Sequence, residues 1–397
     1  MRAATLSSAF VRATPPDAGH PVAYLLPIPR FFSDHRGVGG HVAHAGGMIG
    51  GLAQCGFEVT VLAEESHPVF DRDGVTVRLC PARSSSTLER QRWAPAFIRA
   101  TRDEVRVTPP LFAYIRYSVG FCPWLSRLRR ALEGVPLVIE VNSFAAQDRW
   151  WMGWIERRAL EMGDLIVCVS ERVQDLVRAR LGPGLFRRSM VVPNAVDTSR
   201  FGSECWRERR TPDELRIGYA GILKPGYGLE LLVDTFAAVR GQVPQAVLHV
   251  YGDGPLRGEL EARAARCEGI LFHGAVPFLD MPRVLAGLDI AAYTMAPETS
   301  FGSSTKVYEY MAAGLPIVAA DTPGVRQALG DGEHGLLYPL GDGDALVRQI
   351  VRLAHDPGLA RTLAQRGRDA VNAHHSWTAR VQSLTSEMQR RGLIRLD

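Results

Sequence analysis

Short apolar runs rich in β-branched residues alternate with helical patterns along nearly the whole chain. In the first half, the strand-like runs fall at 22–26, 59–62, 137–141, 165–169 and 190–192, with helical patterns at 41–55, 150–161 and 171–181. This alternation predicts parallel strands connected by helices that cover both faces of a sheet. The first half is therefore predicted to form one doubly wound α/β unit.

The pattern breaks once and then restarts. Residues 197–213 form a polar stretch typical of a domain linker. Strand patterns return at 215–219, 247–251, 270–273, 290–293, 317–319 and 335–338. We predict a loose extension (1–20), a first Rossmann-like domain (21–200), a second Rossmann-like domain (213–376) and a C-terminal helix (377–397) that packs back on the first domain. Two such domains are expected to face each other across a ligand-binding cleft.

Composition excludes several other classes of protein. The 397 residues carry a formal charge of only +4, and the 46 Lys and Arg are interspersed with 42 Asp and Glu, which argues against a nucleic-acid partner. The six cysteines include no CxxC pair, so neither a zinc site nor a disulfide framework is expected. A reducing, cytoplasmic setting fits this usage best.

Several tryptophans and arginines suggest a second kind of surface. If exposed together, they would form a basic aromatic face suited to peripheral membrane contact. Internal packing of the tryptophans is the alternative, and it is favoured because large aromatic side chains are usually buried. The residues concerned are Trp124, Arg127, Arg129, Arg130, Trp150, Trp151 and Trp154.

The stretch 306–316 carries the clearest sign of a ligand. Lys306 and Glu309 are three residues apart, so they share one face of a predicted helix. Ser303, Ser304 and Thr305 precede them and offer a helix cap and free amides to an anion. A strand, a loop and such a helix start together form a crevice that can hold a nucleotide.

Glycine-rich loops follow strands in both halves. Gly39 and Gly40 precede a predicted helix that begins with His41, where the loop is either a phosphate-binding turn or a plain tight turn. The loop 221–228 contributes Lys224, which either contacts a diphosphate or faces solvent.

Two further motifs are interpreted as structural. Residues 252–255, which begin with Gly252, are predicted to form a turn with incidental ligand contact. Asp342 and Asp344 precede an apolar helical segment and are interpreted as a helix cap, not as metal ligands. No metal site and no Ser-His-Asp or Cys-His arrangement is predicted.

The order of these motifs resembles the retaining nucleotide-sugar glycosyltransferases of the GT-B fold, family 4. The resemblance covers nearly the whole chain and depends on the Gly39-Gly40 loop, residues 193–197, 221–228 and 252–255, and the helix that contains Glu309. Within that family, Arg116-Tyr117-Ser118 and Glu140-Val141-Asn142 are similar to one branch.

The resemblance implies a role for each matching residue. Glu309 would bind the ribose hydroxyls, and Lys224 would hold the diphosphate and stabilise its departure. The other implied donor-side residues are Gly39, Gly40, Gly221, Gly252, Ser303, Ser304, Thr305 and Lys306. His41, Arg116 and Asn142 would lie on the acceptor side, and Asn142 is grouped with Lys224 as a catalytic residue.

Three positions depart from the family pattern. Many members have Arg and Lys where this chain has Ile222 and Tyr227. The first carboxylate of a two-glutamate signature is replaced by Phe301, although Glu298 lies nearby. Asn142 occupies the place of a histidine, and an amide cannot act as a general base.

The expected activity is transfer of a sugar from a nucleoside-diphosphate donor to an acceptor hydroxyl, with retention of anomeric configuration and without a metal. No cofactor is expected besides the nucleotide-sugar co-substrate, and the acceptor is a small molecule, a lipid or a glycan. Two alternatives stay open: a nucleotide-sugar-binding protein that has lost catalysis, and a nucleotide-sugar epimerase on the same architecture.

Overall fold

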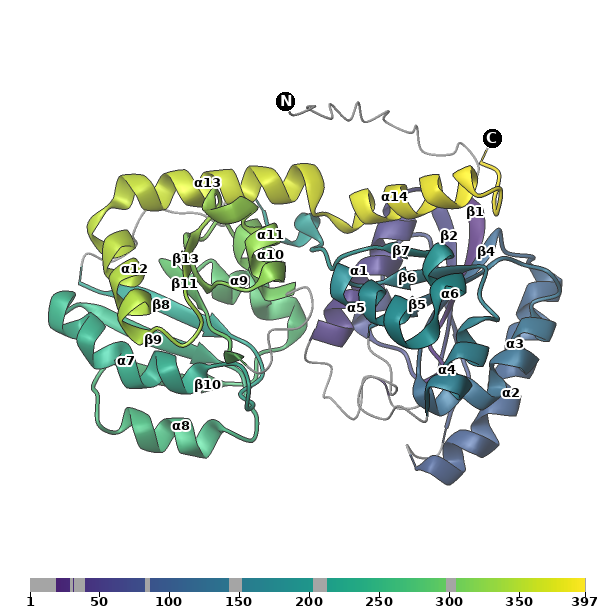
Figure 1. Cartoon of the computed structure of the whole chain (residues 1–397), viewed down its shortest axis with the longest axis horizontal. Helices are drawn as coiled ribbons and strands as arrows, with labels where there is room; N and C mark the ends of the chain where they lie inside the picture. The colour runs from purple at the N-terminus through teal and green to yellow at the C-terminus, as the bar shows by residue number, and fades with distance from the viewer. Residues whose placement is uncertain are drawn as a thin grey trace.

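The chain contains two parallel sheets in a computed structural model, which describes residues 19–28, 31, 40–82, 86–142, 152–202, 213–297 and 305–396 (Figure 1). The first sheet has seven strands in the order β3-β2-β1-β4-β5-β6-β7, and the second has six in the order β10-β9-β8-β11-β12-β13. Each order reverses once, between β1 and β4 and between β8 and β11. The predicted fold class, two Rossmann-like units, is confirmed.

The first domain alternates strands with helices. Its elements are β1 (His20–Leu25), α1 (Gly40–Gln54), β2 (Phe57–Ala63), η2 (Pro68–Phe70), β3 (Val75–Leu79), α2 (Thr87–Val107), β4 (Phe112–Arg116), η3 (Val119–Trp124), α3 (Leu125–Ala131), β5 (Leu137–Val141), α4 (Gly153–Leu160), β6 (Leu165–Cys168), α5 (Glu171–Leu176), η6 (Val177–Leu181), α6 (Pro183–Arg187), β7 (Ser189–Val191) and η7 (Thr198–Arg200).

The second half of the chain repeats this scheme and ends in three consecutive helices. Its elements are β8 (Leu215–Ala220), α7 (Leu229–Gln242), β9 (Ala246–Tyr251), α8 (Arg257–Ala264), β10 (Ile270–Gly274), η9 (Phe278–Asp280), α9 (Met281–Leu285), β11 (Ile290–Tyr293), α10 (Thr305–Ala312), β12 (Ile317–Ala320), α11 (Pro323–Ala328), η11 (Gly330–Gly332), β13 (Leu336–Tyr338), α12 (Gly343–His355), α13 (Pro357–His374) and α14 (Trp377–Arg390).

Two strands of the first sheet were not predicted. β4 lies in the middle of the sheet and is buried except at Arg116, so it lacks the alternation that marks a strand with one exposed face. β3 is an edge strand whose residues are mostly exposed. The predicted helix over 171–181 also changes character, because its last five residues form a π-helix.

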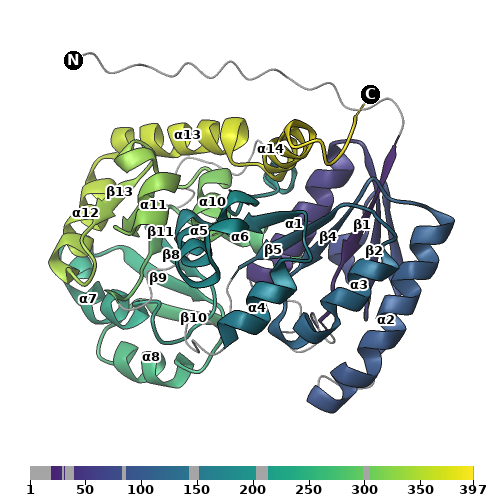
Figure 2. The same cartoon turned by 45° about the vertical axis from the view of Figure 1, so that its right-hand side comes forward.

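Alternate residues of the central strands enter cores on opposite faces of each sheet. In β5, Leu137 and Ile139 belong to one core cluster of the first domain, while Val138 belongs to the other. Burial on both faces explains why the central strands are nearly continuous apolar runs. Helices therefore cover both faces of the first sheet, as Figure 2 shows.

The last helix crosses from the second domain to the first. α13 lies along the second domain, and α14 continues over the first domain beside α1 (Figures 1 and 2). Two glycines of α1 allow this close approach: a Cβ on Gly47 would lie 1.9 Å from Trp377 Nε1, and one on Gly51 would lie 2.9 Å from the Trp377 carbonyl carbon. The Trp377 side chain is consequently buried in the first-domain core.

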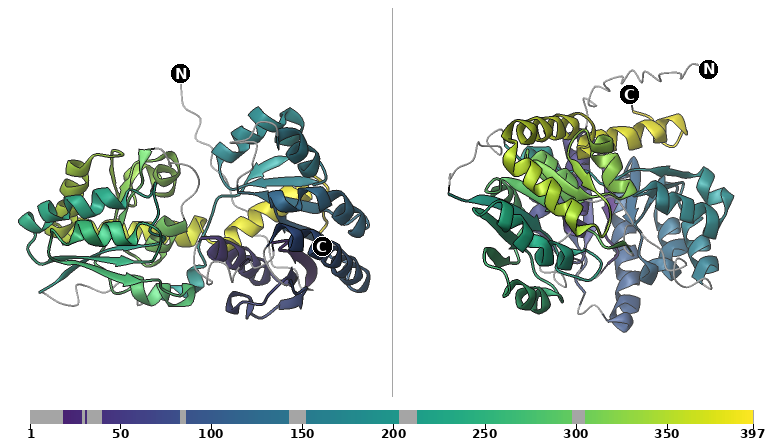
Figure 3. Two further views of the ribbon diagram at one scale, coloured as in Figure 1. Left: turned by 90° about the horizontal axis from the view of Figure 1, so that it is seen from below. Right: turned by 60° about the vertical axis from the view of Figure 1, so that its left-hand side comes forward.

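The chain passes between the domains twice, and the two passages are hydrogen-bonded to each other. Val196, which follows β7, pairs with Ser376 in an isolated parallel bridge just before α14. The Val196 amide donates to the His375 carbonyl (3.1 Å), and the Trp377 amide donates to the Val196 carbonyl (3.3 Å). The left view of Figure 3, from below, shows the two domains side by side, with α14, drawn in yellow, reaching across to the first domain.

We predict that Gly47→Ala destabilises the fold by about 1–3 kcal/mol, because its methyl group would overlap the buried Trp377 ring. Gly241→Ala is the matched control, since a methyl group on that helical glycine would have no neighbour within 4 Å and alanine favours a helix by up to about 1 kcal/mol. Urea unfolding measures both variants. A Gly47→Ala protein as stable as the Gly241→Ala protein would contradict the proposed packing.

Candidate functional site

One half of the candidate site lies at the carboxyl ends of β8, β9 and β11 in the second domain. The loop 221–228 follows β8, residues 252–256 follow β9, and α10 is the first helix after β11. Since β8 and β11 flank the reversal of strand order, these segments lie where open α/β sheets bind ligands.

The two loops after β8 and β9 are in direct backbone contact. A Cβ on Gly252 would lie 1.8 Å from the Gly221 carbonyl oxygen, and one on Gly254 would lie 2.2 Å from the Leu223 carbonyl oxygen. The Leu223 amide donates to the Asp253 carbonyl at 3.0 Å. The turn predicted after β9 is therefore confirmed, and its glycines serve the contact with the neighbouring loop.

Lys306 extends from the first turn of α10 beneath the loop after β8. Its Nζ donates to the Tyr219 hydroxyl at 2.8 Å and lies 4.3 Å from the centre of the Tyr227 ring. A Cβ on Gly221 would lie 2.2 Å from this Nζ. Burial lowers the pKa of Lys306 to about 7; Glu309 opposes the shift and Lys224 adds to it.

Tyr227 brings the two lysines of the site together. Lys224 is exposed, and its Nζ lies 5.1 Å from the Tyr227 ring, on which Lys306 also converges. Thr294 holds this loop by donating to the Tyr227 carbonyl at 2.7 Å. Sequence reasoning treated Tyr227 only as a missing cation, but the structure gives it a position as a cation–π platform.

Glu309 lies one turn after Lys306 on α10 and is half-buried. Burial raises the pKa of its carboxyl group, while the positive charges of Arg200 and Lys306 oppose that shift. Arg200 was not identified from the sequence. It follows β7 in η7, lies 3.7 Å from the centre of the Phe278 ring and donates to the Phe278 backbone carbonyl. A cation from the interdomain connection thus acts on the same carboxylate as Lys306.

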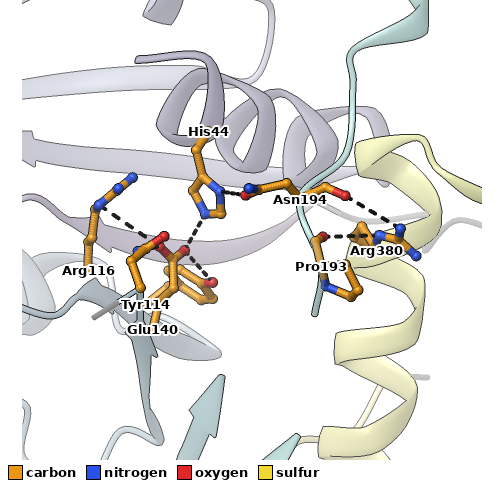
Figure 4. Close-up of polar contacts among 8 residues, drawn as sticks. His44, Tyr114, Arg116, Glu140, Pro193, Asn194 and Arg380 are labelled. Atoms are coloured by element: carbon orange, nitrogen blue, oxygen red, sulfur yellow. Dashed lines mark hydrogen bonds and ion pairs between the residues drawn. The ribbon is translucent and has the colours of Figure 1, made fainter. Parts of the chain in front are cut away.

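The other half of the site surrounds the Glu140 carboxylate in the first domain, at the carboxyl ends of β4 and β5 (Figure 4). Glu140 has no exposed surface. Its Oε2 accepts bonds from His44 Nε2 (2.6 Å) and the Tyr114 hydroxyl (2.8 Å), and its Oε1 accepts one from Asn142 Nδ2 (2.5 Å). Arg116 Nε lies 4.0 Å from Oε1.

These partners keep Glu140 ionised in a buried place. Burial alone raises the pKa of a carboxyl group, but His44, Arg116 and the Tyr114 hydrogen bond outweigh it and lower the Glu140 pKa to about 2. Tyr24 stacks on Tyr114 with ring centres 5.4 Å apart, and its buried hydroxyl has no partner among the described residues.

His44 connects this carboxylate to the segment between the domains. Its Nδ1 lies 2.6 Å from Asn194 Oδ1, and its ring meets Trp377 edge-on at 4.8 Å. Arg380 of α14 donates to the carbonyls of Pro193 (3.1 Å) and Asn194 (3.5 Å), as Figure 4 shows. His44 was not predicted from the sequence. The feature that could have identified it is its position as a polar residue on the apolar face of α1.

The structure groups the predicted site residues that it describes into these two halves. Gly221, Lys224, Gly252, Thr305, Lys306 and Glu309 lie in the second-domain half, and Arg116 and Asn142 lie in the first-domain half. α1, which carries His44, contacts α10. Gly40 begins α1, whereas Gly39, Trp150, Trp151, Glu298, Phe301, Ser303, Ser304 and the His41 side chain lie outside the described residues.

Other sequence predictions have mixed outcomes. Asp342 caps α12 by accepting from the Ala345 amide at 2.8 Å, which confirms the cap. Internal packing is wrong for Trp154, which is 66% exposed with Arg158 stacked 4.7 Å away. Across the described ranges, no His, Cys, Asp or Glu group of three or more has a metal-binding arrangement. None of the helices in those ranges is long and apolar enough to span a bilayer.

Two family models match the chain. The one described as Glycosyltransferase Family 4 matches residues 38–200, and the one described as Glycosyl transferases group 1 matches residues 214–356. Together they cover every strand of the two sheets except β1.

Individual curated proteins match only part of the chain, at low sequence identity. The 2-deoxystreptamine glucosyltransferase of Streptomyces kanamyceticus is 27% identical, over 56% of this chain and 60% of that protein. The GDP-mannose-dependent alpha-(1-6)-phosphatidylinositol monomannoside mannosyltransferase of Mycolicibacterium smegmatis is 25% identical, over 58% of this chain and 64% of that protein. The chain thus spans less than two thirds of the length of these curated relatives.

A solved structure extends the likeness to almost the whole chain. The crystal structure of HepE from Anabaena, in complex with UDP and glucose, superposes with a TM-score of 0.70. The superposition covers 94% of this chain and 100% of the HepE chain. The sequence identity is 17%, so the likeness shows the fold alone.

We predict that Glu140 makes the fold sensitive to acid. Because its folded pKa is about 2 and its ordinary value is 4.5, its contribution is complete above pH 4.5 and is lost as pH falls toward 2. The loss amounts to about 3 kcal/mol. Urea unfolding between pH 6 and 3 should show a flatter dependence for Glu140→Gln than for the wild type. The exposed Glu333→Gln is the control and should keep the wild-type slope.

Proposed function

Because this chain belongs to the glycosyltransferases of the GT-B fold, we propose that it transfers a sugar from a nucleoside-diphosphate donor to an acceptor hydroxyl with retention of anomeric configuration. The observation that carries the proposal is the convergence of Lys224 and Lys306 on the Tyr227 ring. Lys306 also lies one helix turn before Glu309 on α10.

The donor diphosphate is assigned to the two lysines. Lys224 offers an exposed ammonium group, and Lys306 offers a half-buried one at the start of α10, where helix amides favour an anion. HepE binds UDP and glucose, and the mannosyltransferase relative depends on GDP-mannose by name. Both comparisons support a nucleotide-sugar donor.

The donor ribose is assigned to Glu309. A half-buried carboxylate that faces Arg200 and Lys306 is held in place by charge and can accept hydrogen bonds from two neighbouring hydroxyls. Arg200 would connect ribose binding to the segment between the domains, because η7 lies within that segment.

The proposed reaction is a front-face substitution. The acceptor oxygen forms a bond to the anomeric carbon on the side from which the diphosphate leaves, and the bond between that carbon and the phosphate oxygen breaks. The acceptor proton passes to the leaving phosphate oxygen. Positive potential from Lys224, Lys306 and the α10 amides would stabilise the departing diphosphate without a metal.

The acceptor is assigned to the first-domain half, which contains Arg116 and Asn142. Small molecules, lipids and glycans all stay candidate acceptors. Contact with an anionic membrane stays a prediction, and the exposed Trp154 beside Arg158 is the described feature that supports it.

A thermal-shift panel of UDP, GDP, ADP and dTDP sugars tests the donor class, since a ligand that binds only the folded chain raises its melting temperature. Incubation of the stabilising nucleotide sugar with candidate acceptors then tests transfer. Glycosylated product or donor hydrolysis supports the proposal. Stabilisation without turnover would favour a binding protein, and sugar interconversion without an acceptor would favour an epimerase.

We predict that Glu309→Ala weakens donor binding about 10- to 100-fold, because hydrogen bonds to a charged acceptor contribute about 1.5–3 kcal/mol. Transfer at subsaturating donor should fall by a similar factor. Titration calorimetry with the stabilising nucleotide sugar measures the affinity, and the exposed Glu333→Ala serves as the control. Equal affinities in the two variants would remove the ribose role from Glu309.

We predict that donor affinity declines as pH rises above 7. Lys306 has a pKa of about 7, so it is protonated below that pH and neutral above it in the empty site. A diphosphate prefers the protonated form, so the dissociation constant should increase up to about tenfold per pH unit above 7. Lys306→Met should bind weakly at every pH without this dependence. A wild-type affinity that is constant from pH 6 to 9 would exclude the diphosphate contact.

A further inference from the structure

Among the residues that the structure describes, the Asn142 side chain makes one hydrogen bond, and that bond uses its amide nitrogen. Asn142 Nδ2 donates to Glu140 Oε1 at 2.5 Å, while its Oδ1 has no partner among the described residues. Asn142 follows β5 directly and is half-buried, whereas Glu140 beneath it is fully buried. One end of the amide is fixed in the interior, and the other end is left to accept a bond.

The chemistry of Glu140 fixes which end of the amide faces it. An ionised carboxylate only accepts hydrogen bonds, so an asparagine that turned its oxygen toward Oε1 would place two acceptors together. His44 and Tyr114 donate to the other oxygen at 2.6 and 2.8 Å and hold the carboxylate in its ionised form. The two orientations of the Asn142 amide are therefore unequal in energy.

We propose that Glu140 is a positioning residue that turns the Asn142 carbonyl oxygen toward the acceptor, so that this oxygen selects a hydroxyl or amino group and rejects a phosphate or carboxylate. The inference depends on the proposed glycosyl transfer. It assigns Asn142 a binding contact in place of proton removal, because an amide oxygen at neutral pH accepts a hydrogen bond but takes up no proton.

The selectivity follows from hydrogen-bond polarity. An anionic group at this position would meet the Asn142 carbonyl oxygen and place two acceptors together, because an amide oxygen donates no hydrogen bond. A hydroxyl supplies the missing donor. A site that pairs a buried acceptor with a substrate hydroxyl discriminates strongly against analogues that lack the hydroxyl.

The first test observes the Asn142 amide directly and needs no activity. In a spectrum of ¹⁵N-labelled Asn side chains, the Asn142 signals are assigned by their loss in Asn142→Asp. We expect one of its two amide protons to be shifted downfield in the wild type and to return to an ordinary position in Glu140→Gln. Signals at ordinary positions in both proteins would overturn the orientation.

The second test separates acceptor from donor recognition. Octyl glycosides serve as acceptor probes, and the best one is compared with its monodeoxy analogues. For the wild type, removal of one hydroxyl should lower kcat/KM at least tenfold. For Asn142→Ala the same removal should have little effect, and the donor dissociation constant should match the wild-type value. Equal sensitivity of both proteins to every deoxy analogue would overturn the acceptor contact.

A third test uses an exchange of the two side-chain types. In Asn142→Asp, two carboxylates face each other amid Tyr24, His44, Tyr114 and Arg116, so the new acid must bind a proton to keep the contact. Its kcat/KM should rise at least tenfold relative to wild type as pH falls from 8 to 6. In the double variant Glu140→Gln/Asn142→Asp, the amide at 140 is the donor and the carboxylate at 142 is the acceptor, and the net charge of the pair equals that of the wild type. The double variant should therefore recover activity at pH 8.

The outcomes distinguish this inference from the proposed function. A wild-type protein that binds nucleotide sugars but forms no product refutes the proposed transfer, and with it the acceptor contact, while the amide spectrum still decides the orientation. Transfer by the wild type together with an unshifted pH profile in Asn142→Asp and no recovery in the double variant would overturn the positioning role alone.

Discussion

The ionised carboxylate of Glu140, buried without any exposed surface, is the interaction on which the first domain depends most. A lone buried charge would cost several kcal/mol, so the fold must bring donors to it. They come from separate elements: His44 from α1, Tyr114 and Arg116 from β4, and Asn142 from the residue after β5. Helix α1 and the two strands can therefore occupy only the relative positions in which all these bonds form. The same set of bonds places the side chains that the proposed reaction uses.

His44 extends this constraint to the junction between the domains. Its second ring nitrogen faces Asn194, and its ring contacts Trp377 at the start of α14. Arg380 of α14 then holds the backbone of Pro193 and Asn194. The first-domain site and both passages of the chain between the domains thus share one continuous set of contacts. A movement of Asn194 or of α14 relative to α1 would therefore alter contacts of the Glu140 site.

The sequence was sufficient for the repeated α/β pattern, because apolar runs and helical periodicity are local signals. It was sufficient for placing Lys306 and Glu309 on one helix, for the same reason. It failed for contacts between distant segments: His44 and Asn194 are 150 positions apart, and Arg200 and Phe278 are 78 positions apart. It also failed for β4, where full burial removes alternation. The part of the site that depends on one element was predictable, and the part assembled from several was not.

The two halves of the site differ in how their charges are balanced. In the first domain, His44 and Arg116 lie next to the Glu140 carboxylate. The negative charge of Glu140 is therefore balanced before any ligand binds. In the second domain, burial disfavours the ammonium form of Lys306. The positive charge of Lys224 adds to this effect, and the negative charge of Glu309 opposes it. In the proposed reaction, a diphosphate next to Lys306 would offset that cost, because an opposite charge favours the ammonium form.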